Sequence, residues 1–401
     1  MVDPPQRVST GFLLLYALAW AGAAIAYMPF LTILLPVRVG LLAGASVGID
    51  WLAYLSFGGA LAASAGHLLF GWLSDVSGGR RPWIIAGLIG SCLLLGAVPL
   101  ATSLPALLAL IIAWQLALNM MLAPLAALAG DHVPDNQKGR LGGLLAFAPG
   151  LGALSGSLVT WPGMIEGDGR LWLVAGLVPL CVLPVLLLRL PARVVPVQVV
   201  PALPPAASAL PLPEAMVRRM WLARLAVQIA EATLFAYLYF WFQSVDASMT
   251  DNRVASLFAA ILIASAPLAL AAGGWADRSG QPFAPLVLAA LAAAAGLAGM
   301  ALANSMAGAV AGFCLFSLAS AVFLALHSAQ TLRVLVRPDR AKPSLGRDLG
   351  LFNLTNTIPS LIMPWLTIGM MPRFGFPGLF LALALLCVGG ALILLRLARR
   401  P

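Results

Sequence analysis

The chain has 401 residues, of which 61% are apolar and only 9% are charged, whereas about 25% are charged in an ordinary soluble domain. So few charges argue against a soluble enzyme and against a disordered chain. The net charge of +9 is divided among short clusters between long apolar runs, which argues against nucleic-acid binding as well. The solvent for most of this chain is therefore expected to be lipid.

Twelve apolar runs are long enough to cross a bilayer, which takes about 20 residues each. The expected spans are 10–36, 49–73, 82–101, 104–128, 141–162, 170–190, 219–243, 253–275, 283–302, 305–331, 348–370 and 376–397. We therefore expect an all-α polytopic membrane protein with two pseudo-symmetric six-helix bundles, over 1–190 and 218–401. Between them, 191–217 is rich in proline and is expected to be a cytoplasmic linker without regular helix.

Basic residues set the expected orientation. With the N-terminus in the cytoplasm, eighteen of them fall on the inner side, and only Arg38, Arg170, Arg253 and Arg373 fall outside. Cytoplasmic loops of membrane proteins carry such an excess of Lys and Arg, so both termini are expected to be cytoplasmic. We expect a monomer in the plasma membrane, which in a bacterium is the inner membrane.

The two halves carry matching loops. After the second and the eighth span the chain has Gly-x-x-x-Asp followed by a second glycine, and the fifth and eleventh spans begin with Gly-Arg-x-x-Gly. Repeated six-span halves are typical of secondary transporters. The matching residues are Gly71, Asp75, Gly78, Arg80 and Arg81 in the first loop, Gly273, Asp277, Arg278 and Gly280 in the second, and Arg140 and Arg347 in the spans.

The first of these loops resembles the signature Gly-x-x-x-Asp-(Arg/Lys)-x-Gly-x-(Arg/Lys)-(Arg/Lys) of the major facilitator superfamily, with Val76 in place of a basic residue. This resemblance implies a transporter whose spans 1, 4, 7 and 10 line a central cavity. Segments 74–84, 119–140 and 346–359 are similar to the sucrose-transporter branch and its glycoside–pentoside–hexuronide cation symporter relatives. Where plant-type members of that branch carry an aspartate in span 4, this chain has Gln115, which cannot carry a proton.

Charged residues at the inner ends of the spans are expected to form a latch that closes the cytoplasmic side in one transport state. Asp75 lies where a carboxylate can pair with arginines and cap a neighbouring helix. The alternative is a solvated turn that only sets the topology. The latch residues are Gly71, Asp75, Gly78, Arg80, Arg81, Asp131, Arg140, Asp277, Arg278 and Arg347.

The seventh span holds the candidate proton site. Arg224, Gln228 and Glu231 are spaced four and three residues apart and therefore share one helix face. Glu231 is expected near the middle of the membrane, where loss of solvation favours a protonated carboxyl and suits a proton carrier. A structural pair between Glu231 and Arg224 is the alternative, although they lie about 10 Å apart along the helix axis.

Neutral polar and aromatic residues are the candidates for solute binding. Gln115 and Asn119 share a face of the fourth span, where amides suit a polyhydroxy solute or an interhelical hydrogen bond. Trp20 and Tyr27 in the first span either stack on a sugar face or fill space between helices. Further candidates are Asn353 and Asn356, with His67 as a lesser one. His327 lies near the cytoplasmic end, where a gate residue or a satisfied histidine is expected rather than a solute contact.

The sequence favours a proton-coupled symporter of a small polar, sugar-like solute. A proton-driven exporter of drugs or metabolites stays open, because segment 148–153 partly resembles an antiporter motif. A non-transporting membrane protein on the same scaffold is the third interpretation. The chain has neither a phosphate-binding loop nor metal-ligand spacing. We therefore expect no enzymatic activity, no cofactor and no metal, and as partners the solute, protons and the bilayer, with no nucleic acid.

Overall fold

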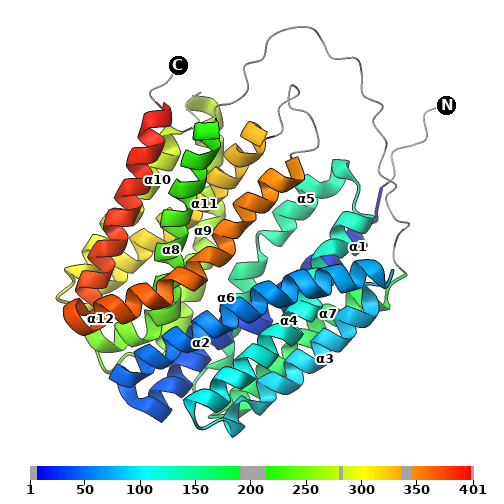
Figure 1. Cartoon of the computed structure of the whole chain (residues 1–401), viewed down its shortest axis with the longest axis horizontal. Helices are drawn as coiled ribbons and strands as arrows, with labels where there is room; N and C mark the ends of the chain where they lie inside the picture. Colours follow the sequence, from blue (N-terminus) through cyan, green and yellow to red (C-terminus); the bar gives the residue numbers. More distant parts are fainter. Residues whose placement is uncertain (1–6, 190, 192–213, 280–282, 336–344, 399–401) are drawn as a thin grey trace. The chain divides into compact units, whose positions relative to one another are not determined.

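The structure, a computed structural model, describes residues 7–189, 191, 214–279, 283–335 and 345–398. Throughout this described part the regular secondary structure is helical (Figure 1). In chain order the helices are α1 (Thr10–Pro29), η1 (Phe30–Leu34), α2 (Leu35–Val76), α3 (Arg81–Ala97), η2 (Val98–Leu100), α4 (Leu104–His132), α5 (Asp135–Leu145), α6 (Ala148–Val159), α7 (Gly169–Leu187), α8 (Glu214–Val245), α9 (Asp251–Ser279), α10 (Ala284–Ala301), α11 (Met306–Leu335) and α12 (Leu345–Ala398).

Eleven helical stretches among the described residues are long and apolar enough to cross a membrane. The last stretch, Thr355–Arg396, contains Gly375 at φ 58°, where α12 turns back in two arms (Figure 1). Gly44, at φ 72°, likewise divides Thr10–Gly44 from Ser46–Val76. Glycine adopts this backbone conformation without steric cost. With both arms of α12 counted, the expected all-α polytopic fold of twelve spans is confirmed, while the orientation of the termini stays a prediction.

Two expected spans differ from the observed helices. Span 141–162 corresponds to the membrane-length stretch Gln137–Val159, but its helix is interrupted between α5 and α6, just before Pro149. The first span, expected to end at 36, continues through the π-helix η1 into α2, and η1 lies between Pro29 and Pro36. Proline lacks the N–H group that the helical hydrogen-bond ladder needs, so the ladder is irregular at both places.

Contacts divide the chain into two compact units. The first unit contains Met1–Pro29 and Ala62–Leu210, and the second contains Phe30–Leu61 and Pro211–Pro401. In the second unit, the ring of Phe240 lies close to Gly40 and Gly48, and Phe57 forms an edge contact with Trp365 at 5.2 Å between ring centroids. Segment 192–213 of the expected linker lies outside the described residues, and the bundle boundaries at 190 and 218 stay a prediction.

Each unit contains a closely packed pair of helices at corresponding places of the repeat. In the first unit, a Cβ atom added at Gly87 of α3 would overlap the backbone at Met121 of α4. In the second unit, a Cβ atom at Gly296 of α10 would overlap the backbone at Phe316 of α11. Small residues let membrane helices approach this closely. The third and fourth spans and the ninth and tenth spans thus pack in the same way.

Candidate functional site

The loop between α2 and α3 brings charged residues together at the end of the first unit. Helix α2 ends at Val76, and Gly78 then takes φ 68°, which turns the chain so that α3 begins at Arg81 with a proline in its first turn. Ser74 donates a hydrogen bond of 2.8 Å to the Gly71 carbonyl. The glycine turn therefore places Arg80 beside the end of α2.

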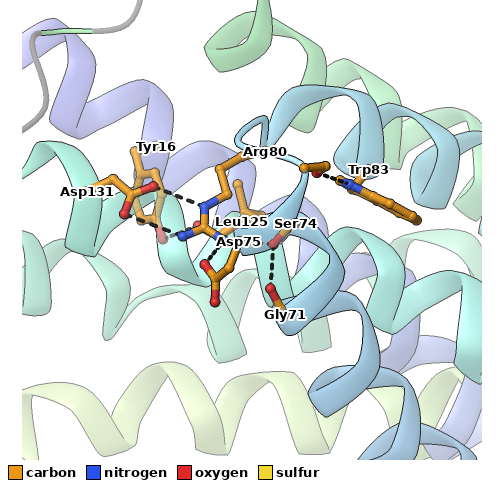
Figure 2. Close-up of polar contacts among 9 residues, drawn as sticks. Tyr16, Gly71, Ser74, Asp75, Arg80, Trp83, Leu125 and Asp131 are labelled. Carbon is orange, nitrogen blue, oxygen red and sulfur yellow. Dashed lines mark hydrogen bonds and ion pairs between the residues drawn. The ribbon is translucent and has the colours of Figure 1, made fainter.

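Arg80 lies between two carboxylates from different helices (Figure 2). Its Nε donates to Asp131 Oδ2 at 3.0 Å, its Nη2 to Asp131 Oδ1 at 3.5 Å, and its Nη1 lies 2.5 Å from Asp75 Oδ1. Nη1 also donates to Ser74 Oγ at 2.7 Å. The side chain of Arg80 is only 12% exposed, against 25% for Asp131 and 62% for Asp75. Asp131 is thus the partner more shielded from solvent, and its two carboxylate oxygens accept hydrogen bonds from two nitrogens of the guanidinium group.

The balance of charges keeps Arg80 ionised. Burial lowers the pKa of Arg80, but the hydrogen bonds and charges of Asp131 and Asp75 outweigh burial, so its pKa lies above the ordinary value. Arg80, Asp75, Asp131 and Ser74 form what we call the Arg80 cluster. The sequence predicted its three charged members, and the structure brings them together.

The two predicted latch glycines contact this cluster through their backbone, Gly71 with Ser74 and Gly78 with Asp75, whereas the other predicted arginines have no described contact with it. Arg81 donates to the Leu188 carbonyl just after α7. Arg140 and Arg278 are exposed. The side chains of Asp277 and Arg347 lie outside what the structure describes. The second copy of the latch therefore stays a prediction.

Helix α8 carries a second polar cluster, in the second unit and within a membrane-length stretch. Arg224 Nη1 donates to Ser328 Oγ of α11 at 2.8 Å, and Nη2 donates to Asn356 Oδ1 of α12 at 3.3 Å. Arg224 Nε donates to Gln228 Oε1 at 3.3 Å, and Gln228 Nε2 donates to Asn356 Oδ1 at 2.7 Å. We call these four residues the Arg224 cluster. Ser328 and Asn356 are exposed in it.

Glu231 lies on the same face of α8, two turns from Arg224, and is only partly accessible. Its charge interacts with that of Arg224. Within the described part of the chain Glu231 makes no hydrogen bond or ion pair, and the hydrogen-bonding partners of Arg224 are neutral. The two charges therefore influence one another without forming a direct pair.

The predicted amides of the fourth span meet a histidine from the second. Asn119 Nδ2 donates to the Gln115 carbonyl at 2.9 Å, and Asn119 Oδ1 lies 3.3 Å from His67 Nδ1. Gln115 and Asn119 are buried, whereas His67 is exposed. A Cβ atom at Gly66 would lie 3.2 Å from the Asn119 Cβ, so this glycine allows α2 to approach α4. His67, a lesser candidate from the sequence, thus joins the two amides.

The aromatic residues of the first span have packing contacts. The ring of Trp20 stacks near the buried Tyr16 at 6.5 Å between centroids, and Tyr16 Oη donates to the Leu125 carbonyl at 2.9 Å. Trp20 and Tyr27 both pack against Ala148 at the start of α6 and two alanines of α1. Space filling between helices accounts for these contacts, and a role in stacking on a solute stays a prediction.

Two further residues of α11 bear on the site. His327 is fully buried, and its Nε2 lies 2.9 Å from the Met220 carbonyl, so it is a satisfied histidine, which is one of the two roles that the sequence favoured over solute contact. Ser328, its neighbour, was missed, because a serine at the end of an apolar helix carries no sequence signal for a partner on another helix. The side chain of Asn353 lies outside what the structure describes. Among the described residues there is no group of three or more His, Cys, Asp and Glu side chains that could hold a metal.

Comparison with known proteins identifies the family of the chain. The family model described as Major Facilitator Superfamily matches residues 12–335. The chain belongs to this superfamily. It is therefore an integral membrane protein that transports a small-molecule solute, and it is a transporter rather than an enzyme. No curated protein matches the sequence, and the resemblance to the sucrose-transporter branch stays a prediction.

Solved structures share the fold at low sequence identity. A bacterial homologue of the human lysosomal transporter Spinster, in an inward-facing, unoccupied conformation, is 14% identical with a TM-score of 0.65, and the match covers 97% of this chain and 95% of the other. The human organic anion transporter MFSD10 is 15% identical with a TM-score of 0.67, over 95% and 98% of the two chains. At these identities the likeness concerns the fold alone.

Proposed function

We propose that this superfamily member is a proton-coupled symporter that moves a small polar solute, with a sugar-like solute favoured, by alternating access. The observation that carries the proposal is the Arg224 cluster, in which an arginine inside a membrane-length helix contacts an exposed amide and an exposed hydroxyl. Polar groups at this depth are costly and usually mark a solute or ion pathway. Exposed donors and acceptors there offer hydrogen bonds to solute hydroxyls.

The chemistry of the cluster suits a neutral polyhydroxy ligand. Gln228 and Asn356 each present both a donor and an acceptor, and Arg224 presents a planar fork of donors. The interactions of Arg224 with Gln228 and Asn356 are both 3.3 Å long. Solute hydroxyls can replace these contacts without leaving the guanidinium unpaired. In the first unit, the side chains of His67, Asn119 and Gln115 provide a second set of polar groups.

Glu231 is the proposed proton carrier. Within the described residues it lacks a hydrogen-bonding partner, and its charge is felt by Arg224 on the same helix face. When Glu231 takes up a proton, Arg224 loses that compensating charge and the electrostatics of the whole cluster change. Proton loading and solute binding are thereby coupled on one helix. The Arg80 cluster acts as a latch in this scheme, closed in one transport state and opened in the other.

The exporter interpretation gains no specific support. Its signal was the glycine-containing segment 148–153, and a Cβ atom at Gly152 would lie 2.8 Å from Met28 Sδ and 3.0 Å from Ala24 Cβ. This glycine is therefore explained by the close approach of α1 and α6. Export remains an outcome that the experiment below distinguishes.

The test uses purified protein reconstituted in liposomes that contain a pH-sensitive dye. Wild type, Glu231→Gln and the control Glu166→Gln are given gradients of sugars, polyols, organic acids and cationic drugs in turn. Glu166 lies exposed in the loop between α6 and α7, so its variant makes the same chemical change away from the Arg224 cluster. We expect proton entry with one neutral solute in wild type and in Glu166→Gln, and none in Glu231→Gln.

Each other result overturns a defined part of the proposal. Proton movement opposite to a lipophilic solute would identify an exporter. Solute entry without proton movement would contradict proton coupling. Equal proton fluxes in Glu231→Gln and wild type would show that Glu231 has a structural role.

A further inference from the structure

The second unit has an apolar groove between three of its helices. Helix α11 packs extensively against both α9 and α10, whereas α9 and α10 contact one another only slightly. The space left between α9 and α10 is a cavity of about 350 Å³ whose floor is α11. That volume lies within the range of about 300–1,000 Å³ of small-molecule sites. We call this space the α9–α11 groove.

The lining of the groove is hydrocarbon. It includes Leu268 and Trp275 of α9, Leu288 and Ala289 of α10, and Ala319 and Leu326 of α11. The larger side chains at its rim are exposed, with 43% for Leu268, 48% for Trp275 and 56% for Leu288. Apart from the indole N–H of Trp275, side chains of this kind offer no hydrogen bonds to the polar solute proposed above, and they match an acyl chain.

The groove takes its lining from different parts of the three helices. The lining comes from the C-terminal part of α9, the N-terminal part of α10 and the middle of α11. On α11 the lining extends from Leu315 to Leu326, which at about 1.5 Å per residue is about 16 Å. Half of a bilayer core of about 30 Å is about the same length. The groove therefore has the length of about one leaflet. On α9 and α10 it lies in the half that the basic residues assign to the cytoplasm, and on α11 it extends to the middle of the membrane-length stretch.

A cation follows the groove lining on α9. Arg278 follows Trp275 by three residues on α9, so the two side chains share a helix face, and both are exposed. Indole and guanidinium groups are the side chains that favour the headgroup region of a bilayer. An arginine there complements the phosphate of an anionic lipid.

We propose that the α9–α11 groove is a binding site for an anionic phospholipid of the inner leaflet, with an acyl chain along α11 and the phosphate at Arg278. The lipid fills the space that α9 and α10 leave between them. This site lies outside the Arg224 cluster and does not depend on which solute is transported.

The test uses delipidated protein in detergent and phosphatidylglycerol that carries bromine atoms on one acyl chain, because bromine quenches nearby tryptophans. The difference between wild type and Trp275→Phe isolates the emission of Trp275. We expect saturable quenching of Trp275 that unlabelled phosphatidylglycerol reverses and phosphatidylcholine does not. Arg278→Gln should weaken binding about fivefold, because a basic residue near a membrane surface contributes about 1 kcal/mol to anionic-lipid binding.

A matched pair of variants on α10 tests the groove itself. Ala292 lines the groove, and Ala292→Phe should abolish the saturable quenching, whereas Leu291→Phe at the adjacent position outside the lining should leave it unchanged. Displacement by phosphatidylcholine as effective as by phosphatidylglycerol would overturn the proposal, and this result does not depend on the folding of any variant other than Trp275→Phe. Quenching that fails because two copies of the chain associate over the groove, seen as a concentration-dependent dimer, would overturn it as well.

Discussion

Two arginines, one in each unit, have opposite kinds of partners: Arg80 lies just before the start of α3, and Arg224 lies within α8. Arg80 in the first unit is 12% exposed and lies between the carboxylates of Asp131 and Asp75. Arg224 in the second unit contacts the neutral groups of Gln228, Ser328 and Asn356. The first guanidinium has its counter-charges in place. The second interacts electrostatically with Glu231 on the same helix, and the two side chains form no described hydrogen bond or ion pair.

This difference suggests a structural role for Arg80 and a binding role for Arg224. An arginine that binds both oxygens of a carboxylate is held strongly in one position. Such a contact suits a latch that stabilises one transport state. An arginine in a membrane whose hydrogen-bonding partners are neutral lacks a paired counter-charge, which is costly. Binding of a ligand, or a change in protonation of a nearby carboxyl, therefore alters its electrostatic energy strongly. The variants below test whether these two roles are distinct.

The largest expected effect belongs to Arg224→Gln. Hydrogen bonds from a charged group contribute about 1.5–3 kcal/mol, so we expect the initial rate of solute uptake into liposomes to fall about 10- to 100-fold. Arg218→Gln, an exposed position earlier on α8, makes the same change outside the cluster and should keep uptake near the wild-type rate. Equal losses in the two variants would show that positive charge on α8, and not the Arg224 cluster, is what transport needs.

A smaller effect, on stability, is expected for the two carboxylates around Arg80. Asp131→Asn removes the shielded charge and should cost about 2 kcal/mol, whereas Asp75→Asn removes a charge that is 62% exposed and should cost less than about 1 kcal/mol. Thermal unfolding in detergent compares the two. A larger fall in Tm for Asp75→Asn would show that the contact at 2.5 Å outweighs burial of the partner.

The smallest effect concerns the turn that places Arg80. Gly78 has φ 68°, so Gly78→Ala puts a side chain in the left-handed region at a cost of about 1 kcal/mol. Gly79 is the control, because a Cβ atom there would lie 3.7 Å from Pro82 Cδ, which is an ordinary contact. A lower Tm for Gly78→Ala than for Gly79→Ala would confirm the constraint. Equal Tm values would show that the loop adjusts freely.

The sequence predicted the helices well because hydropathy alone determines them. Runs of about 20 apolar residues located the spans. The interruption within span 141–162 was not predicted, because the hydropathy of an apolar run does not show that Pro149 interrupts the helical hydrogen-bond ladder. The assignment of Phe30–Leu61 to the second unit could not be predicted from the sequence either, because contacts between distant segments leave no local sequence pattern.

The sequence predicted which residues belong to the candidate sites, but not which of them contact one another. Arg224, Gln228 and Glu231 were found because helical spacing places them on one face. Arg80 and Asp131 are 51 residues apart, and Arg224 and Ser328 are 104 residues apart, so their contacts depend on tertiary structure. The sequence therefore predicted charged groups at both places, and only the structure distinguished an arginine with carboxylate partners from one with neutral partners.

The most direct test of the central claim is a ligand-induced shift in Tm, measured for wild type, Arg224→Gln and Asp131→Asn with the solute identified in liposomes. A ligand at 100 times its Kd stabilises the folded state by about 2.7 kcal/mol. We predict that Asp131→Asn has a lower starting Tm but keeps the wild-type shift, and that Arg224→Gln loses the shift. A shift retained in Arg224→Gln and lost in Asp131→Asn would contradict the account, because the solute would then depend on the Arg80 cluster.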